Sequence, residues 1–463
     1  MKNSLQKSGQ RKTTRRLRYL TEIAAILLAT SAANCFLPIQ QEKHYLLLVL
    51  TAIASFFTAI LPILPSLNYP SLRLKIAAYG AICLEVFAIS SVLSLAWHIY
   101  AAFRYLPGQW GIYLLSLLIW TLAMVPLFWA GMIASVVGAK QLTLRLKLLG
   151  ILLGWVPLAN IGVLWTMILK VQEEVRYESR RLYLNEARKD DRVCATRYPI
   201  LLVHGIFGKD HQLYSYWGRI PKELEQNGAT VYFGNHQSAA SVAQCAEELT
   251  FRIEQLVKKT GCEKVNIIAH SKGGLDCRRA ITFCGAAPYV ASLTTVSTPH
   301  RGCEYADYLL KAIPEKAQNK VAATYNRAMQ HLGEHDPDFL AAIRDLTADG
   351  CRRLNEEAEA AGEAEHFEGI FTQSYGSVLS RSKSGGFPMN LTYLLAKFFV
   401  GPNDGLVSET SFAFGERYQL ISHKGDRGIS HLDTVDLLHQ NLPDFDIREF
   451  YVELVSDLKN RGL

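Results

Sequence analysis

The 463-residue sequence predicts two parts of different fold class: an all-α transmembrane part of about five helices, and an α/β part with a helical insertion. Two observations predict this division. Long apolar stretches with almost no charge follow one another through the first third of the chain. Further along, short apolar runs lead into glycine turns and helix-like segments, a succession that is typical of a parallel sheet.

The apolar stretches lie near residues 20–39, 45–67, 76–100, 110–138 and 148–169. Each is long enough to cross about 30 Å of hydrocarbon at about 1.5 Å per residue. Six of the seven tryptophans also lie in this third of the chain, as expected of residues that anchor helices at a membrane interface. We therefore predict a multi-pass protein of the cell membrane. The first stretch is not interpreted as a cleaved signal peptide, because further apolar stretches follow it.

The balance of acidic and basic residues also changes at the end of the apolar stretches, near residue 170. Residues 1–170 contain three acidic and fifteen basic side chains, whereas the remainder carries 34 basic and 39 acidic ones. The net charge of +7 therefore belongs to the membrane part and does not indicate nucleic-acid binding. Loop charges favour an extracytoplasmic α/β part, whereas the six Lys and Arg of residues 171–196 favour the other side. Glu85, deep inside a stretch, is expected to be a protonated or hydrogen-bonded structural residue.

The most informative motif surrounds Ser271. Residues 265–268 form a short apolar run that predicts a buried strand, and residues 274–281 predict a helix. A serine on so tight a strand-to-helix turn has strained backbone, and its Oγ projects from the end of the sheet. The small residues Ala269 and Gly273 allow the strand and the helix to approach closely. This pattern is typical of a nucleophile elbow.

A second turn precedes the elbow in the sequence. Residues 199–203 predict another apolar strand, which leads directly into residues 204–208, a turn flanked by glycines. Such a turn lets a backbone N–H point at a substrate oxygen, and we assign this role to Ile206. The second donor is expected to be the N–H of Lys272, directly after the nucleophile.

The remaining catalytic candidates follow the elbow in the order Ser271, Asp404, His431. A serine needs an imidazole to accept its proton, and the imidazole needs a carboxylate that fixes its tautomer. Asp404 lies in a Gly-Pro-Asn-Asp-Gly loop, where a merely turn-forming aspartate is the alternative. His431 competes with His423 and His439 for the role of base, and its position before a helix-like run favours it.

These residues resemble bacterial triacylglycerol lipases of the α/β-hydrolase superfamily over residues 198–463. The matching segments are residues 204–205, 235–241, 264–268, 269–273, 297–302, 403–407 and 431–433. The resemblance implies that Ser271 is the nucleophile, Asp404 the acid and His431 the base, with Ile206 and Lys272 forming the oxyanion hole. A lysine after the nucleophile departs from the secreted lipases, which carry an uncharged residue there.

The resemblance also raises the question of calcium. In the secreted lipases a carboxylate that matches Asp433 pairs with another carboxylate shortly before the catalytic acid. Residues 387–391 offer no acid at that place, and Ca²⁺ needs several hard oxygen ligands. We therefore expect no cofactor, with Asp433 as the one calcium candidate.

The predicted boundaries are a transmembrane domain at residues 1–170, a charged connector at 171–196 and a lipase-like domain at 197–463. A helical cap is predicted over about residues 304–390, because residues 304–370 are rich in Ala, Glu, Leu and Lys. Seven of the nine cysteines follow residue 190, without the spacing of a metal site or a disulfide framework.

The sequence thus predicts a membrane-anchored serine carboxylic ester hydrolase that cleaves lipid or lipophilic esters. Its expected partners are the lipid ester substrate and the bilayer. Two alternatives remain open: an acyltransferase with the same triad, in which an alcohol replaces water, and a catalytically inactive membrane scaffold.

Overall fold

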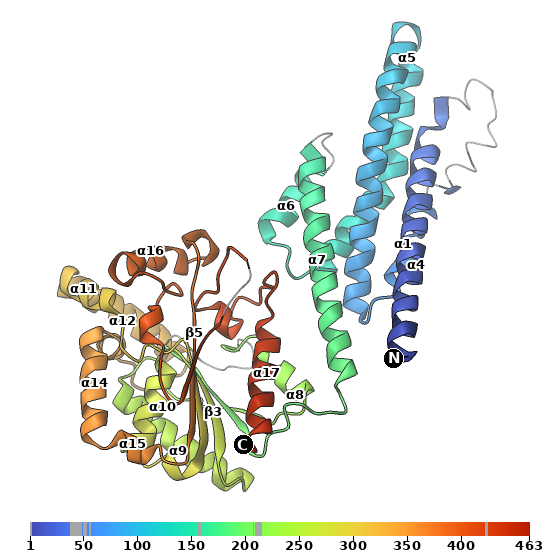
Figure 1. Ribbon diagram of the computed structural model, residues 1–463. Coiled ribbons are helices and arrows are strands. Elements are labelled where there is room, and N and C mark those ends of the chain that lie inside the picture. The colour runs from blue at the N-terminus through green and yellow to red at the C-terminus, as the bar shows by residue number, and fades with distance from the viewer. Residues whose placement is uncertain are drawn as a thin grey trace. The chain divides into compact units, whose positions relative to one another are not determined.

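The computed structural model describes residues 2–37, 49, 53–54, 57–154, 159–206, 208, 215–421 and 425–463 (Figure 1). The chain divides into two compact units, Met1–Glu186 and Ala187–Leu463, which are described separately below.

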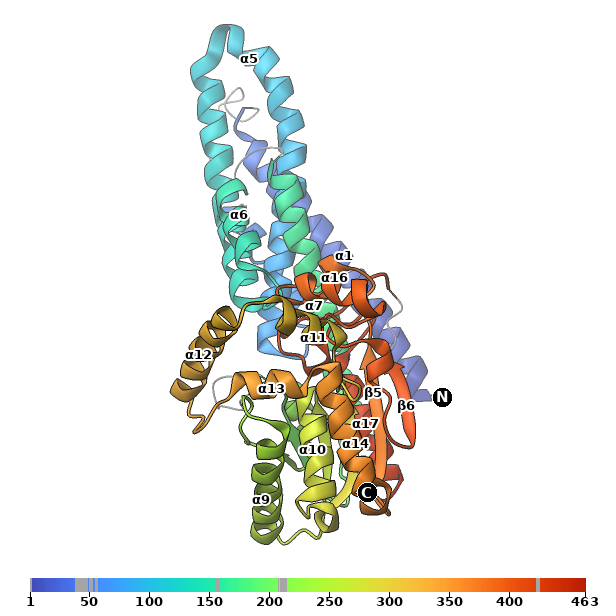
Figure 2. The same cartoon turned by 90° about the vertical axis from the view of Figure 1, so that its left-hand side faces the viewer.

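The first unit is helical. Its helices are α1 (Lys2–Asn34), α4 (Ile63–Ser66), α5 (Leu72–Gly138), α6 (Leu144–Leu153) and α7 (Ala159–Ala187). The longest, α5, is a hairpin of two arms (Figure 2) that bends at Gln109, where φ is −138° and ψ is 40°. Pro107 precedes the bend and has no N–H to continue the helical hydrogen bonds.

Small residues bring the two arms of α5 into close contact. A Cβ added to Gly80 would lie 2.5 Å from the backbone nitrogen of Ser135, and one on Gly138 would lie 2.5 Å from that of Ala77. Alanines of α1 join the same buried cluster, which shows that α1 packs against this hairpin. Glu85 accepts a hydrogen bond from Gln172 Nε2 (2.9 Å), in agreement with the expectation of a hydrogen-bonded structural residue.

The prediction of five spanning helices is not supported. By length and hydropathy, the described residues contain one candidate span, α5, whose arms include the stretches 76–100 and 110–138. Parts of the stretch 45–67, namely residues 45–48, 50–52 and 55–56, lie outside the described residues. The stretch 148–169 is not one helix, because α6 ends at Leu153 and α7 begins at Ala159. The charged second half of α7 continues into the predicted connector, so residue 170 lies inside a helix.

The second unit contains one parallel sheet of six strands in the order β2-β1-β3-β4-β5-β6. The strands are β1 (Ile200–Val203), β2 (Val231–Phe233), β3 (Val265–His270), β4 (Val290–Val296), β5 (Phe371–Ser377) and β6 (Arg417–Ile421). The helices that share its two main cores are α8 (Ile220–Gln226), α9 (Val242–Thr260), α10 (Lys272–Phe283) and α17 (Ile447–Asn460).

The two faces of the sheet are covered by different helices. One buried cluster joins the sheet to α8 and α17, and includes Trp217 and Tyr451. The other joins it to α9 and α10, and includes Leu249 and Ile281. Parallel strands buried on both faces are typically continuous apolar runs, as β1 and β3 are. The carboxyl ends of the strands form one edge, where sites of open α/β sheets lie.

Five helices follow β4 and form most of the predicted cap. They are α11 (Glu304–Ala312), α12 (Glu315–His331), α13 (Phe339–Asp345), α14 (Ala348–Ala360) and α15 (Glu363–His366). The predicted end of the cap near residue 390 is wrong, because β5 pairs with β4 inside that range. Its buried polar side chains conceal this strand in the sequence: Gln373, for example, donates to Thr294 Oγ1 (3.0 Å). A further helix, α16 (Met389–Val400), follows β5.

Candidate active site

Ser271 occupies the turn between β3 and α10 with φ 55° and ψ −132°. Positive φ is uncommon for a residue with a Cβ, and such strain is concentrated at functional turns. The Ser271 N–H donates to the carbonyl oxygen of Val296 on β4 (3.0 Å), which holds the turn against the sheet. The predicted strand, sharp turn and helix are therefore present, with Ser271 only 6% exposed.

Glycines allow the neighbouring loop to approach the elbow. A Cβ on Gly205 would lie 2.7 Å from Ser271 Cβ, and a Cβ on Gly273 would lie 2.4 Å from the carbonyl oxygen of His204. Both distances are shorter than real Cβ contacts, so any larger residue would push the loop of Ile206 away from the nucleophile. The small residue predicted two positions after Ser271 thus has a clear steric reason.

Asp404 and His431 form a buried pair. His431 Nδ1 lies 2.7 Å from Asp404 Oδ2, and the Asp404 side chain is fully buried. The other carboxylate oxygen accepts the backbone N–H groups of Leu406 (3.0 Å) and Val407 (2.8 Å). A backbone bond from the His431 N–H to the Asp404 carbonyl oxygen (2.8 Å) also joins the two loops. This arrangement orients the imidazole and leaves its Nε2 as the nitrogen available for proton transfer.

Of the other two candidates for the base, the structure describes only His439. His439 is exposed, with a positive φ of 52°. His423 lies outside the described residues. The structure thus brings His431, rather than His439, to Asp404.

His270 belongs to a buried hydrogen-bonded chain that sequence reasoning missed. Its Nδ1 lies 2.6 Å from the Tyr216 hydroxyl, and its Nε2 lies 3.0 Å from Thr434 Oγ1. Thr434 has one hydroxyl proton and donates it to the His431 carbonyl oxygen (2.6 Å). Thr434 therefore accepts from Nε2–H of His270, and Tyr216 donates to Nδ1. The chain fixes one neutral tautomer of His270 and ties it to the backbone of His431.

The electrostatic state of His270 suits this position. Burial, together with the nearby His431, holds the pKa of His270 well below its ordinary value. The ring centroids of the two histidines are 4.5 Å apart. Because His270 stays neutral, it does not oppose a positive charge that develops on His431.

The candidate oxyanion donors lie on either side of Ser271. Lys272 is the first residue of α10, and the first N–H groups of a helix have no acceptor within that helix. Ile206 follows Gly205 and is buried under the cap, in a cluster with Leu275, Ala342 and Leu346. Both N–H groups are thus on elements whose positions are set by packing.

The Lys272 side chain is fully buried, beneath the elbow. Its Nζ lies 2.8 and 3.1 Å from the two carboxylate oxygens of Asp276 and 3.2 Å from Cys245 Sγ. Burial alone would lower the pKa of Lys272, but the Asp276 carboxylate outweighs it, and the pKa is raised overall. His236 Nε2 lies 3.4 Å from Asp276, and the His236 ring stacks on His204 with centroids 4.3 Å apart. The i, i+4 spacing of Lys272 and Asp276 was the only sequence signal of this cluster.

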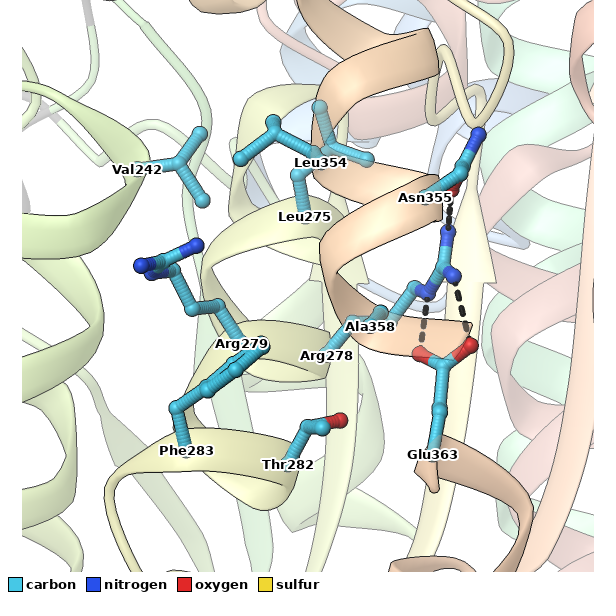
Figure 3. A pocket seen from close by; sticks show the side chains of 10 residues that line it. All are labelled: Val242, Leu275, Arg278, Arg279, Thr282, Phe283, Leu354, Asn355, Ala358 and Glu363. Atoms are coloured by element: carbon cyan, nitrogen blue, oxygen red, sulfur yellow. Dashed lines mark hydrogen bonds and ion pairs between the residues drawn. The ribbon is translucent and has the colours of Figure 1, made fainter. Parts of the chain in front are cut away.

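The cap is tied to α10, the helix that follows Ser271. Arg278 of α10 forms two hydrogen bonds with Glu363 (2.9 and 2.8 Å) and one with Asn355 (3.0 Å), as Figure 3 shows. The space among these side chains has a volume of only about 20 Å³. It holds little more than a water molecule, and an acyl chain does not fit there.

A second tie joins the cap to residues 235–241. Glu334, buried between α12 and α13, accepts from the backbone N–H (2.9 Å) and the hydroxyl (2.5 Å) of Ser238. Asp345 accepts the Val242 N–H (2.7 Å) at the start of α9. The segment that resembles the lipases thus serves as a fixed support for the cap.

Asp433, the calcium candidate, is engaged by other groups. Its carboxylate lies 2.7 Å from Arg427 and accepts the Ser430 N–H (2.9 Å) and hydroxyl (2.7 Å). Among the residues that the structure describes, no cluster of three His, Cys, Asp or Glu side chains could hold a metal ion. A guanidinium on this carboxylate does not fit a cation site, because the two positive charges would repel each other.

Comparisons with known proteins agree with this geometry. The family model described as palmitoyl protein thioesterase matches residues 199–334. A triacylglycerol lipase of Pseudarthrobacter phenanthrenivorans is 33% identical over 298 residues, which cover 54% of this chain and 91% of the relative. One from Burkholderia plantarii is 33% identical (54% and 81% covered), and one from Pseudomonas fragi is 31% identical (58% and 98% covered).

The parallel sheet, the strained serine and the buried Asp–His pair define the class: an ester hydrolase with an α/β-hydrolase-like fold. The sequence relatives assign the chain to one family within this class. The chain belongs to the triacylglycerol lipase family.

Proposed function

We propose that this protein is a membrane-anchored serine hydrolase that cleaves lipid or lipophilic carboxylic esters through an acyl-enzyme. The observation that carries the proposal is the strained Ser271 turn in the same unit as the buried Asp404–His431 pair. In this mechanism Ser271 Oγ attacks the ester carbonyl and gives its proton to His431 Nε2. Asp404 holds the imidazole through Nδ1 and stabilises its charged form.

The oxyanion then forms beside the N–H groups of Ile206 and Lys272, which are set in position before the reaction. His431 returns its proton to the leaving alcohol. In the second half of the reaction His431 takes a proton from water, which attacks the acyl carbonyl. The bond between Ser271 Oγ and the acyl group then breaks, His431 returns the proton to Ser271 Oγ, and the carboxylic acid is released. The neutral His270 supports both halves, because it holds the His431 backbone without adding a competing charge.

The apolar surface of α16 supports the proposal that the substrate is lipophilic. Leu391, Leu394 and Phe398 are exposed by 61%, 59% and 84% and follow an i, i+3, i+7 spacing, so they share one face of the helix. This helix leads directly into the loop of Asp404 and is bound to it, because Asn403 donates to the Tyr393 carbonyl oxygen (3.4 Å). An apolar face so close to the acid suits esters with hydrocarbon chains.

Membrane anchoring is the second element of the proposal. It is supported by the mean hydropathy of 2.0 in the most apolar window of α5 and by exposed large apolar side chains on both arms, such as Phe103 and Leu122. Anchoring would raise the effective concentration of the enzyme at bilayer substrates.

The nucleophile is tested with Ser271→Ala. This change should lower turnover of a p-nitrophenyl ester by at least about 10³-fold, because members of a triad act as a unit. Labelling by a fluorophosphonate probe should disappear at the same time, whereas expression and melting temperature stay unchanged. A variant that retained a tenth of the activity would remove Ser271 from this role. A wild-type protein that took up no probe would favour the inactive scaffold.

Anchoring is tested with a fragment of residues 187–463, the second compact unit. It should hydrolyse short soluble esters at nearly the full rate and lose activity on liposomes that contain lipid esters. Equal activity of the fragment and the full chain on liposomes would contradict the anchoring proposal and leave the hydrolase proposal intact.

A further inference from the structure

The first unit contains a cavity of about 620 Å³ that the hydrolase reaction does not use. Side chains from both arms of α5 line it, and Ile161 of α7 contributes to its wall. Most of its lining is apolar, including Phe87, Leu95, Leu117 and Met124. Its volume lies within the range of small-molecule sites, about 300–1,000 Å³, and such sites combine apolar walls with a few polar groups.

Three polar side chains on this cavity lack partners. Both ring nitrogens of His98, the Trp120 Nε1 and the Ser91 Oγ are buried, with no hydrogen bond to any of the residues that the structure describes. His98 is only 4% exposed, and its ring centroid lies 5.7 Å from that of Trp120. Ser91 precedes His98 by about two helical turns on the same face of α5.

Unpaired polar groups of this kind are costly. A buried donor or acceptor without a partner is unfavourable, because it has lost its hydrogen bonds to water and gained none in the protein. His98 carries one N–H donor and one acceptor nitrogen in its neutral form, and the Trp120 N–H only donates. A ligand that pairs with the Trp120 N–H and with the acceptor nitrogen of His98 therefore needs an acceptor oxygen and a hydroxyl donor close together, followed by a hydrocarbon portion that matches the apolar walls.

We propose that this cavity binds a long-chain fatty acid in its protonated form. The carboxylic acid O–H donates to the acceptor nitrogen of His98, and the carbonyl oxygen of the same group accepts the Trp120 N–H. None of the lining residues that the structure describes is a Lys or Arg that could pair with a carboxylate. Because an unpaired buried charge is strongly disfavoured, the neutral acid is the bound form. The site is independent of Ser271, although ester hydrolysis produces molecules of this class.

The proposal is tested with the full-length protein in detergent, by native mass spectrometry with added oleic acid. Wild-type protein should bind one oleic acid. His98→Phe keeps an aromatic ring but removes both polar nitrogens, and it should weaken binding by about 5- to 150-fold, the equivalent of about 1–3 kcal/mol. Ser91→Trp should abolish binding by filling the cavity. Leu122→Phe is the matched control, because Leu122 lies on the same helix but is 61% exposed and does not line the cavity.

Two comparisons make the outcome decisive. Methyl oleate, which lacks the hydroxyl, should bind clearly more weakly than oleic acid, and equal binding would overturn the recognition of an acid. An oleic acid analogue with a terminal diazirine should label peptides that contain Phe87, Leu95, Leu117 or Met124. Labelling spread over the outward-facing residues of both arms, unchanged in Ser91→Trp, would show nonspecific lipid contact and overturn the site. Melting curves identify any variant that fails to fold. In that case the labelling pattern of the wild-type protein alone decides whether the acid binds in this cavity.

Discussion

Removing the counter-ion of Lys272 should strongly destabilise the hydrolase unit. Lys272 and Asp276 side chains are 0% and 1% exposed, and they are joined at 2.8 Å. Asp276→Asn removes the carboxylate that is hydrogen-bonded to the buried ammonium, and breaking such a pair costs about 3–5 kcal/mol. For a domain of about 150–250 residues, each kcal/mol shifts the melting temperature by about 2–4 °C, so we expect a decrease of about 6–20 °C.

The assay combines thermal melting with hydrolysis of a short soluble ester. The double variant Lys272→Met with Asp276→Leu removes both charges and should recover most of the lost stability, because apolar residues can replace a buried pair. It should also keep activity within about tenfold, because the proposed oxyanion donor is the backbone N–H of residue 272, which the substitution retains.

The matched control is the exposed pair Glu254–Lys258, which has the same i, i+4 spacing at 3.6 Å, with Lys258 75% exposed. Glu254→Gln should cost less than about 1 kcal/mol, as is usual for surface pairs. If Asp276→Asn melted within about 2 °C of the wild type, as this control should, the argument that Lys272 is a buried charge dependent on Asp276 would be refuted.

The remaining predictions concern the base, acid stability and calcium. Thr434→Val should lower kcat for a soluble ester by about tenfold and leave KM unchanged, because it removes the link to the His431 backbone; Thr434→Ser should restore the rate. Burial holds the pKa of His204, His270 and His300 well below the ordinary value. As pH falls below about 6.5, these histidines gain protons only in the unfolded chain. The free energy of unfolding is therefore highest above that pH, and below it decreases by up to about 1.4 kcal/mol per histidine and pH unit. A urea midpoint that stays constant between about pH 7 and 5 would contradict this. EGTA should leave hydrolysis and melting unchanged, because Arg427 and Ser430 engage Asp433, and a calcium-reversible loss would reveal another site.

The predictable part of the fold is the part with continuous apolar runs. Strand β1 is such a run and β3 contains one at residues 267–269, and both strands are buried. Strand β5 was assigned to the cap because its sequence mixes Gln, Ser and Thr with aromatic residues, and those polar side chains find partners only in the folded sheet. The hairpin of α5 was predicted as two helices, and its close packing depends on glycines that no periodicity reveals.

In the candidate site, too, local motifs predict some residues, whereas other contacts appear only in the folded chain. The order of Ser271, Asp404 and His431 in the chain was sufficient to propose a triad, because each lies in a recognisable local motif. The contacts of His270 with Tyr216 and Thr434 join residues that are far apart in the sequence, and no local pattern encodes them. The sequence marked Lys272 as unusual, but only the structure shows that its charge is neutralised inside the unit.

The position of α17 has a consequence for how the enzyme is made. This C-terminal helix packs its Tyr451 against Trp217, near the start of the hydrolase unit, and the Tyr451 hydroxyl donates to the Thr434 carbonyl oxygen (2.9 Å). Trp217 is translated long before Tyr451. The apolar face that β1 and α8 present to α17 therefore remains uncovered while the cap is translated. The proposed base, His431, also follows the cap in the chain. Hydrolytic activity should therefore begin only after α17 has been translated and has covered this face.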